Sequence, residues 1–533
     1  MSDSISKESI SIQKSSSVIS QDSNSMSSPL PQSQGNVHLS TLDTIPQSIT
    51  RPTSSKPDDE EAQLGSEEEE EDIIEVKDPA PVLPMNSGYS WVVLTCAFFI
   101  NFCAWGNNSA FAVYFAYYSS HNDTLYKGAT GVDFAAIGGI TFGVGLLFAP
   151  LINFITGKIG SRGALSIGNV IQFVALFLTS FDSHNQLWQL YLTQGLLQSF
   201  GLAFLGIPCF TILPQWFNNK PIGEKYIISD RMLTLSQGLA SAGSGAGGIL
   251  FNLGMQKVLQ VYDVRWALRV QSFISIFVVS LSIFFLRVRK NPNVKIAFTF
   301  FNKDVFFFPG FWGGVLYLVF AMFGYVVLLY SLADWTLSLG YSEYQGSIVA
   351  ALISLGIMIG RPIVGLLSDR FGAISTAAYS YLICAILSLA MWIPARNYAT
   401  AIALGILTGA VSGTVFPTVA TITLNIVNFR FSKFNVTFYM EWVFLGAAAI
   451  VSPVIGIALK KSELGPTQYA HCSIFVGISF ICIFIELMIL RGFIISTREI
   501  ATKEMTDEEY FGIRPSMSRI ITNTFRFKGV EGI

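Results

Sequence analysis

The sequence predicts an all-α protein that crosses a membrane many times. Of its 533 residues, 51% are hydrophobic and only 13% are charged, whereas soluble proteins carry about 25% charged residues. The apolar residues fall into long runs, and about 20 such residues in a row suffice for one helix to cross the hydrocarbon core. Composition and run length together indicate a polytopic membrane protein.

Twelve apolar runs are candidate membrane-spanning helices, and a basic stretch at 287–295 separates six of them from the other six. We therefore expect two six-helix halves. The runs lie at roughly 89–117, 134–156, 164–181, 187–213, 232–253, 266–286, 311–334, 346–367, 374–394, 399–425, 435–459 and 470–495.

The same runs divide the chain into five regions. The expected regions are a tail (1–87), an N-terminal half (88–286), a cytoplasmic linker (287–310), a C-terminal half (311–495) and a cytoplasmic C-terminal tail (496–533). The first 87 residues hold 16 acidic and 5 basic residues and cannot bury enough apolar surface to offset their ordering entropy, so we expect a disordered acidic tail. Its role is either regulatory, with kinases or the ubiquitin machinery as partners, or simply solubilising.

Loop charge predicts the orientation. With a cytoplasmic N-terminus, the cytoplasmic loops hold 13 Lys and Arg residues and the opposite loops hold 7. Because basic residues are enriched in cytoplasmic loops, both termini should be cytoplasmic. Asn122 then lies outside, in a short motif that can accept glycosylation. The plasma membrane is the expected location, with the vacuolar membrane as the alternative.

Signals for an enzyme or a metalloprotein are missing from the sequence. All six cysteines fall within apolar runs, and the four histidines lie far apart, so neither a disulfide framework nor a metal site is expected. No Walker motif and no serine elbow occurs. We expect no cofactor, no nucleic-acid partner and no enzymatic activity; the expected partners are a small solute and the lipid bilayer.

One loop motif is specific. Residues 365–372 read GLLSDRFG, in which Gly365 allows close helix approach while Asp369 and Arg370 can cap and bridge helix ends. This motif resembles the loop signature of the major facilitator superfamily, whose members have two related halves around a midplane site. The matching stretch of the first half, 157–163, reads GKIGSRG; it keeps Lys158 and Arg162 but lacks the aspartate. We expect these five residues to gate the cytoplasmic side.

Further stretches narrow the resemblance. GYSW at 88–91, LTQG at 192–195, QWF at 215–217, AGSGAGG at 242–248 and GRP at 360–362 together resemble the monocarboxylate-porter branch, and within it the fungal monocarboxylate-transporter homologues. The resemblance covers roughly residues 86–500. The glycine run also satisfies GxGxxG, but no strand precedes it, so helix packing is the preferred interpretation over a dinucleotide site.

Arg361 is the candidate anion-binding residue. A charge inside a span costs at least about 2.5 kcal/mol, so it needs a reason to be there. Snorkelling to the inner surface is one explanation. We prefer a water-filled cavity, because Asp369 already marks that surface two turns later and a guanidinium binds a carboxylate through two hydrogen bonds. The matching arginine of the monocarboxylate branch is implicated in substrate binding, which agrees.

The chain departs from the proton-coupled members of that branch. Ile357 replaces their acidic residue one turn before the arginine, Ser109 replaces a lysine, and Asn86 replaces the opening aspartate. Proton–lactate symport is therefore doubtful. Glu441 lies at a depth similar to that of Arg361, so the two could pair, and Glu441 could supply the missing proton carrier.

Other polar and aromatic groups are candidates for lining the path, although each can equally serve as a helix–helix contact. The expected function is alternating-access transport of a small organic solute, with a carboxylate-type anion favoured. A facilitator of a neutral or riboflavin-like solute and a non-transporting nutrient sensor are the alternatives. The expected substrate-binding residues are Arg361, Asn107, Asn108, Trp105, Gln194, Tyr325 and Glu441.

Overall fold

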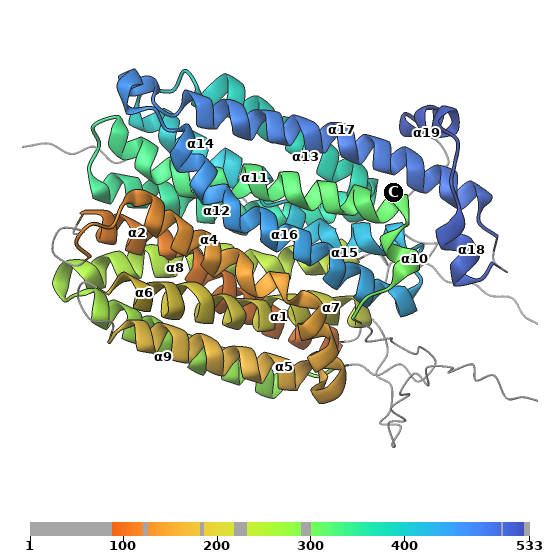
Figure 1. Cartoon of the computed structure of the whole chain (residues 1–533), viewed down its shortest axis with the longest axis horizontal. Helices are drawn as coiled ribbons and strands as arrows, with labels where there is room; N and C mark the ends of the chain where they lie inside the picture. Colours follow the sequence, from red (N-terminus) through yellow and green to blue (C-terminus); the bar gives the residue numbers. More distant parts are fainter. Residues whose placement is uncertain are drawn as a thin grey trace, which may run out of the picture. The chain divides into compact units, whose positions relative to one another are not determined.

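The computed structural model describes residues 88–120, 126–181, 186–217, 232–288, 300–502 and 505–526, which all belong to one compact unit, Lys77–Ile533 (Figure 1). The predicted acidic tail, the Asn122 motif and residues 289–299 of the predicted linker lie outside the described residues.

Helices account for most of this unit, because a backbone in hydrocarbon must satisfy its N–H and C=O groups within its own segment. Figure 1 shows the long helices lying along a common direction. The first series consists of α1 (Gly88–Ser109), α2 (Phe111–Ser120), α4 (Gly131–Leu147), α5 (Ala149–Thr179), α6 (Leu187–Leu190), the π-helix η1 (Tyr191–Leu197), α7 (Gln198–Trp216), α8 (Leu233–Val261) and α9 (Val264–Phe285).

The second series follows the central linker and has the same character. It consists of α10 (Lys303–Phe306), α11 (Pro309–Ser338), α12 (Glu343–Phe371), α13 (Ala373–Ile386), the π-helix η3 (Leu387–Trp392), α14 (Tyr398–Ser412), α15 (Val415–Ile426), α16 (Phe431–Leu459), the 3₁₀-helix η4 (Ser462–Thr467), α17 (Ala470–Ile500), α18 (Asp507–Gly512) and α19 (Met517–Thr524).

Ten helical stretches in the described part of the chain are long and apolar enough to cross a membrane, which establishes a multi-pass membrane protein. The sequence predicts twelve runs, and two places account for the difference. Helix α8 has 29 residues but is rich in glycine and serine. Helix α4, which holds most of the second predicted run, has only 17 residues, and the rest of that run forms the start of α5, which also contains most of the third run.

A turn at Gly160 explains why two predicted runs share α5. Gly160 has φ 77° and ψ 160° inside this helix, a positive-φ conformation that suits glycine. The chain therefore changes direction here without leaving helical structure on either side. This break lies between the second and third predicted runs, 134–156 and 164–181, where the sequence predicts that one helix ends and the next begins.

The two series of helices meet along two seams. Helix α8 packs against α12, and α4 packs against α16. Gly143 and Gly446 show how closely the second seam is packed: a Cβ atom on Gly143 would lie 2.3 Å from the Gly446 carbonyl oxygen, and one on Gly446 would lie 2.7 Å from the Gly143 oxygen. Glycine on both sides lets the two backbones touch, which favours helix association in lipid.

The glycine run of α8 serves helix packing, which confirms the preferred interpretation of the GxGxxG pattern. A Cβ atom on Gly243 would lie 2.1 Å from the Phe98 carbonyl oxygen of α1, and one on Gly245 would lie 2.5 Å from the Ser354 carbonyl oxygen of α12. Gly243 thus allows the close approach of α1, and Gly245 allows the close approach of α12. Helix α8 thereby joins α1 to α12.

The C-terminal segment folds back onto the end of the second series. Arg430 forms an ion pair with Asp507 of α18 and donates to the Met505 carbonyl oxygen at 3.1 Å. The Tyr510 hydroxyl donates to the Ile426 carbonyl oxygen at 2.9 Å. Burial raises the pKa of Tyr510 to about 12, so this hydroxyl keeps its proton and remains a donor at neutral pH.

Candidate functional site

Arg361 lies between the two series of helices. It belongs to α12, ten residues before that helix ends at Phe371, which is about 15 Å along the helix axis. Its side chain is 2% exposed. Nη1 donates to the Ser241 carbonyl oxygen at 2.8 Å and to Ser244 Oγ at 2.5 Å, both on α8. The guanidinium therefore faces protein, and the snorkelling explanation is wrong for this conformation.

Aromatic rings form the other side of the Arg361 pocket. The guanidinium carbon lies 4.3 Å from the centroid of the Phe416 ring of α15, a cation–π distance. Tyr325 of α11 lies beside both groups: its ring centroid is 5.6 Å from that of Phe416, and its hydroxyl interacts with the guanidinium. Hydroxyls and rings thus surround the cation.

The Arg361 charge has no anionic partner among the described residues. The ion pairs found there involve Arg430, Lys460 and Arg526, and Arg361 Nε has no hydrogen-bond partner. A buried charge usually needs a counter-charge, because two hydrogen bonds only partly replace its lost hydration. This position is therefore suited to an anion that comes from outside the chain.

An aromatic cluster fills the space next to Arg361. Trp105 is its centre, with ring centroids 5.3 Å from Phe142, 5.2 Å from Phe416 and 6.2 Å from Trp442. Phe210 adds a contact to Trp442 at 5.6 Å. The five rings come from α1, α4, α7, α15 and α16, so both series contribute. This conformation is closed around the cation, which differs from the water-filled cavity that the sequence suggests.

In this conformation, the side chains of Asn107 and Gln194 form hydrogen bonds to other helices of the first series. Asn107 donates to Ser275 Oγ at 2.8 Å and accepts from Gln271 Nε2 at 3.0 Å, which joins α1 to α9. Gln194 Oε1 accepts from the Tyr118 hydroxyl at 3.1 Å. Both amides thus make helix–helix hydrogen bonds, the alternative that the sequence leaves open.

Asn108 is placed differently from its neighbour. Its side chain is buried, and its Oδ1 atom has no hydrogen-bond partner among the described residues. Tyr330 of α11 lies near it across the boundary between the two series, and the Tyr330 hydroxyl likewise has no hydrogen-bond partner among the described residues. Of the two asparagines, Asn108 is therefore the one with an acceptor to spare near the boundary.

Glu441 lies away from Arg361, and the expected pair between them is not formed. Its carboxyl is 1% exposed, and Oε2 accepts from Thr423 Oγ1 at 2.6 Å. Both Glu441 and Arg361 touch α15, the first through Thr423 and the second through Phe416. These two contacts are seven residues apart, or about 10 Å along the helix. The two charged groups therefore lie at different positions along α15. Their similar depth within their own helices did not predict whether they pair.

Asp369 caps a helix of the opposite series. Its Oδ1 accepts from the Thr234 N–H at 3.0 Å, and its Oδ2 accepts from the Leu235 N–H at 2.7 Å. Both donors belong to the first turn of α8, where N–H groups lack partners within the helix and an anion is stabilised. A Cβ atom on Gly365 would lie 2.6 Å from the Thr234 carbonyl oxygen, so glycine permits this approach.

The other predicted gating residues do not join that contact. Arg370 and Lys158 are exposed, and Lys158 lies over the Phe154 ring at 5.4 Å. Arg162 Nη2 donates to the Phe284 carbonyl oxygen at 2.9 Å, at the last turn of α9. The first-series motif therefore caps a neighbour of its own series, whereas Asp369 bridges the two series.

These features define a class: a multi-pass helical membrane protein with a buried, unpaired cation where its two series of helices meet. The profile of the Major Facilitator Superfamily matches residues 94–453. The chain belongs to the major facilitator superfamily, which confirms the family predicted from the sequence.

Fungal transporters are among its relatives. The chain is 38% identical over 449 residues to the probable transporter MCH2 of Saccharomyces cerevisiae, covering 83% of this chain and 91% of that protein. It is 30% identical over 443 residues to the uncharacterized transporter ESBP6 of the same yeast, covering 80% of this chain and 62% of that protein. It is 23% identical to the MFS transporter asaE of Aspergillus flavus, covering 79% and 90%. The chain is thus a fungal-type membrane transporter of this family.

Proposed function

We propose that this transporter moves an organic anion with a single carboxylate and an apolar body. The observation that carries the proposal is the buried guanidinium of Arg361, which has no counter-charge among the described residues. A carboxylate can accept two parallel hydrogen bonds from such a group. The neighbouring ring of Phe416 and the cluster around Trp105 suit the apolar remainder of the solute.

Transport proceeds by alternating access between the two series of helices. The Asp369 contact with α8 is the closure on the cytoplasmic side, and the α4–α16 seam continues it through the membrane. For a solute to reach Arg361, α8 and α12 must separate, which breaks the hydrogen bonds to Ser241 and Ser244. The carboxylate then takes over those donors.

The full topology in this proposal has twelve spans in two six-helix halves. Helix α8 supplies one of the two spans beyond the ten apolar stretches, and α4 together with the α5 section before Gly160 supplies the other, so the α5 section that follows Gly160 crosses separately. Accessibility tags at positions 161 and 184 test this count. Separate crossing of 161–179 puts the first tag on the cytoplasmic side and the second outside, whereas a single crossing by α5 leaves position 161 inaccessible from either side.

Uptake by cells tests the substrate class. We expect accumulation of labelled aliphatic or aromatic monocarboxylates in a yeast strain that lacks its own uptake, and no accumulation of neutral solutes such as riboflavin. Arg361→Gln should reduce carboxylate uptake at least about tenfold, because one charge-assisted contact contributes about 1.5–3 kcal/mol. Arg370→Gln, which removes an exposed charge from the same helix, is the control. Carboxylate uptake that survives Arg361→Gln contradicts the proposal.

A plasma-membrane location and regulation through the acidic N-terminal tail complete the proposal. A fluorescent fusion of the full chain distinguishes the plasma membrane from the vacuolar membrane. Deleting residues 1–80 should leave the transport rate per surface molecule unchanged if the tail controls only the number of transporters at the surface.

A further inference from the structure

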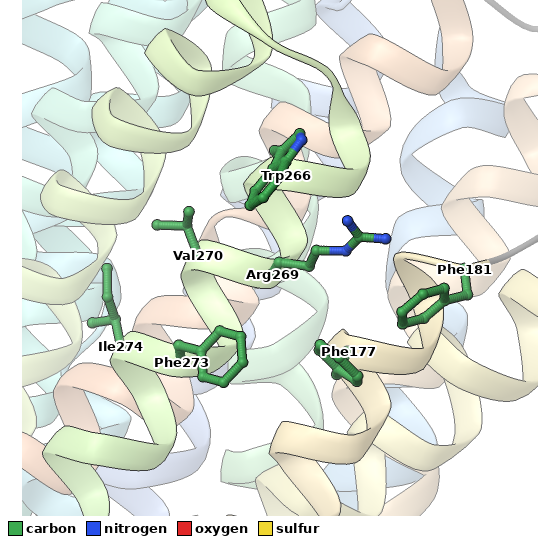
Figure 2. Close-up of a pocket in the computed structure, with 7 residues that line it drawn as sticks. All are labelled: Phe177, Phe181, Trp266, Arg269, Val270, Phe273 and Ile274. Carbon is green, nitrogen blue, oxygen red and sulfur yellow. The ribbon is translucent and has the colours of Figure 1, made fainter.

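A groove on the outer face of α5 and α9 has apolar walls, and the guanidinium of Arg269 lies at its edge. It has a volume of ≈ 550 Å³ and is lined by Phe177, Phe181, Trp266, Arg269, Val270, Phe273 and Ile274. Figure 2 shows Arg269 reaching from α9 towards Phe177 of α5 and Phe181, which follows the end of that helix. The transport route described above uses none of these residues.

The groove opens away from the protein interior. Phe273 is 55% exposed, Phe181 is 57% exposed and Trp266 is 53% exposed. Both α5 and α9 are among the stretches that can cross a membrane, so this face lies against lipid when the chain is in a bilayer. Exposed rings of this size are expected there, because hydrocarbon solvates them.

Arg269 is held at a fixed place near the end of both helices. Nε donates to Ser180 Oγ at 3.1 Å, immediately after α5 ends. The guanidinium carbon lies 4.7 Å from the Phe181 ring centroid and 5.4 Å from that of Trp266. Among the described residues, neither terminal nitrogen of Arg269 has a hydrogen-bond partner. Two donors are thus available on an oriented, planar cation.

The depth of Arg269 matches that of a lipid headgroup. It is the sixth residue of α9, about 8 Å along the axis from the helix start. Tryptophan gathers at the membrane–water interface, and Trp266 lies one turn nearer to the helix start. Phe273 on α9 and Phe177 on α5 lie farther towards the bilayer centre than Arg269 and Phe181. From the interface towards the bilayer centre, the cation comes first and the apolar surface follows. A phospholipid has its phosphate and its acyl chains in the same order.

We propose that this groove is a specific binding site for a phospholipid of the adjacent leaflet. The phosphodiester accepts two hydrogen bonds from the terminal nitrogens of Arg269, a geometry that guanidinium groups favour over ammonium groups. One acyl chain lies along Phe273 and Phe177. The bound lipid covers the junction of α5 and α9 and stabilises their packing.

Phospholipid retention by the purified full chain tests the charged part of the site. The protein is delipidated in mild detergent and titrated with short-chain phosphatidylcholine, and native mass spectrometry counts the bound molecules. Arg269→Gln should weaken the tightest binding event about tenfold, the loss of one charge-assisted contact. Arg269→Lys should restore it only in part. Arg265→Gln removes the same charge one turn away, outside the groove lining, and should leave binding unchanged.

A second pair of variants tests the apolar wall of the groove. Its outcome can be read even if Arg269→Gln fails to fold. Phe273→Ala should weaken binding, whereas Phe277→Ala should not, because Phe277 is exposed on α9 but does not line the groove. Equal lipid affinity in Arg269→Gln and Arg265→Gln overturns the proposal. Diacylglycerol that binds as tightly as phosphatidylcholine also overturns it, because then the phosphate contributes nothing.

Discussion

The contact between Asp369 and α8 gives the sharpest prediction about the cytoplasmic closure. The carboxylate accepts from two N–H groups in the first turn of α8, at 3.0 and 2.7 Å. Asp369→Asn keeps the size of the side chain but removes its charge and turns an NH₂ group towards one of these donors. A hydrogen bond to a charged group contributes about 1.5–3 kcal/mol, and the helix dipole contributes about 0.3–1 kcal/mol, rising to about 2 kcal/mol where the group is partly buried. We take about 2 kcal/mol as the net loss, which shifts the closed–open equilibrium about thirtyfold.

Chemical labelling measures that shift. Thr421 of α15 is buried, and its hydroxyl lies 3.0 Å from that of Thr234 on α8. A Thr421→Cys variant without native cysteines should react with a membrane-impermeant maleimide in inside-out vesicles only when α8 moves away. We expect Asp369→Asn to raise the labelling rate about thirtyfold and Arg370→Gln to leave it unchanged. The same rate in all three proteins would refute the assignment of Asp369 as a closure.

Three further predictions concern packing and the termini of the helices. Gly143→Val should abolish transport and lower folded yield, because its side chain would meet the Gly446 carbonyl oxygen within 2.3 Å, whereas Gly254→Ala, with open space around it, should not; equal fluorescence-detected elution profiles for the two would contradict the seam. Glu441→Gln should keep thermal stability within about 1 kcal/mol of the parent, since this buried carboxyl makes no ion pair among the described residues, while Glu441→Ala should cost about 2 kcal/mol through the void it leaves; a large loss in the Gln variant would indicate a needed negative charge. Arg430→Ala should release α18 and speed proteolytic cleavage near residue 503, because the ion pair and a backbone contact are lost; unchanged cleavage would show that this contact does not hold the segment.

The sequence predicted the all-α membrane fold class and singled out Arg361 and Asp369 as candidate site residues, because each leaves a local signal. Long apolar runs predict membrane helices directly. Arg361 is conspicuous as a cation in such a run, and Asp369 lies in a short motif of fixed spacing. Each of these signals depends only on residues that are close together in the sequence. A single sequence is therefore enough to detect them.

The surroundings of Arg361 were not predictable in the same way. Phe416 and Ser241 come from segments far from it in sequence, and each is an ordinary residue for a membrane helix. Only the rotation of each helix about its own axis brings them together, and that rotation follows from packing at the glycine seams. Ser244 is a polar residue within the glycine run and so indicates a polar contact without naming its partner, whereas Ser241 contributes only its backbone carbonyl.

Glu441 and Gly160 show what residue depth and the spacing of apolar runs can and cannot predict. The predicted pairing of Glu441 with Arg361 assumed that residues at similar depth meet, but their contacts on α15 lie seven residues apart. The break at Gly160 lies between two predicted runs, 134–156 and 164–181, but the sequence does not show that a single positive-φ glycine makes the turn.

Binding of a carboxylate to the purified transporter tests the central claim most directly. Trp105 and Trp442 lie in the cluster that adjoins the Arg361 pocket, so an anion that reaches the guanidinium should change tryptophan fluorescence. We predict that an unlabelled aromatic monocarboxylate quenches the tryptophan fluorescence of the parent protein in a saturable way. Arg361→Gln should bind the same carboxylate at least about tenfold more weakly. Identical binding curves for the two proteins, with both shown to be folded, would contradict the assignment of Arg361 as the anion site.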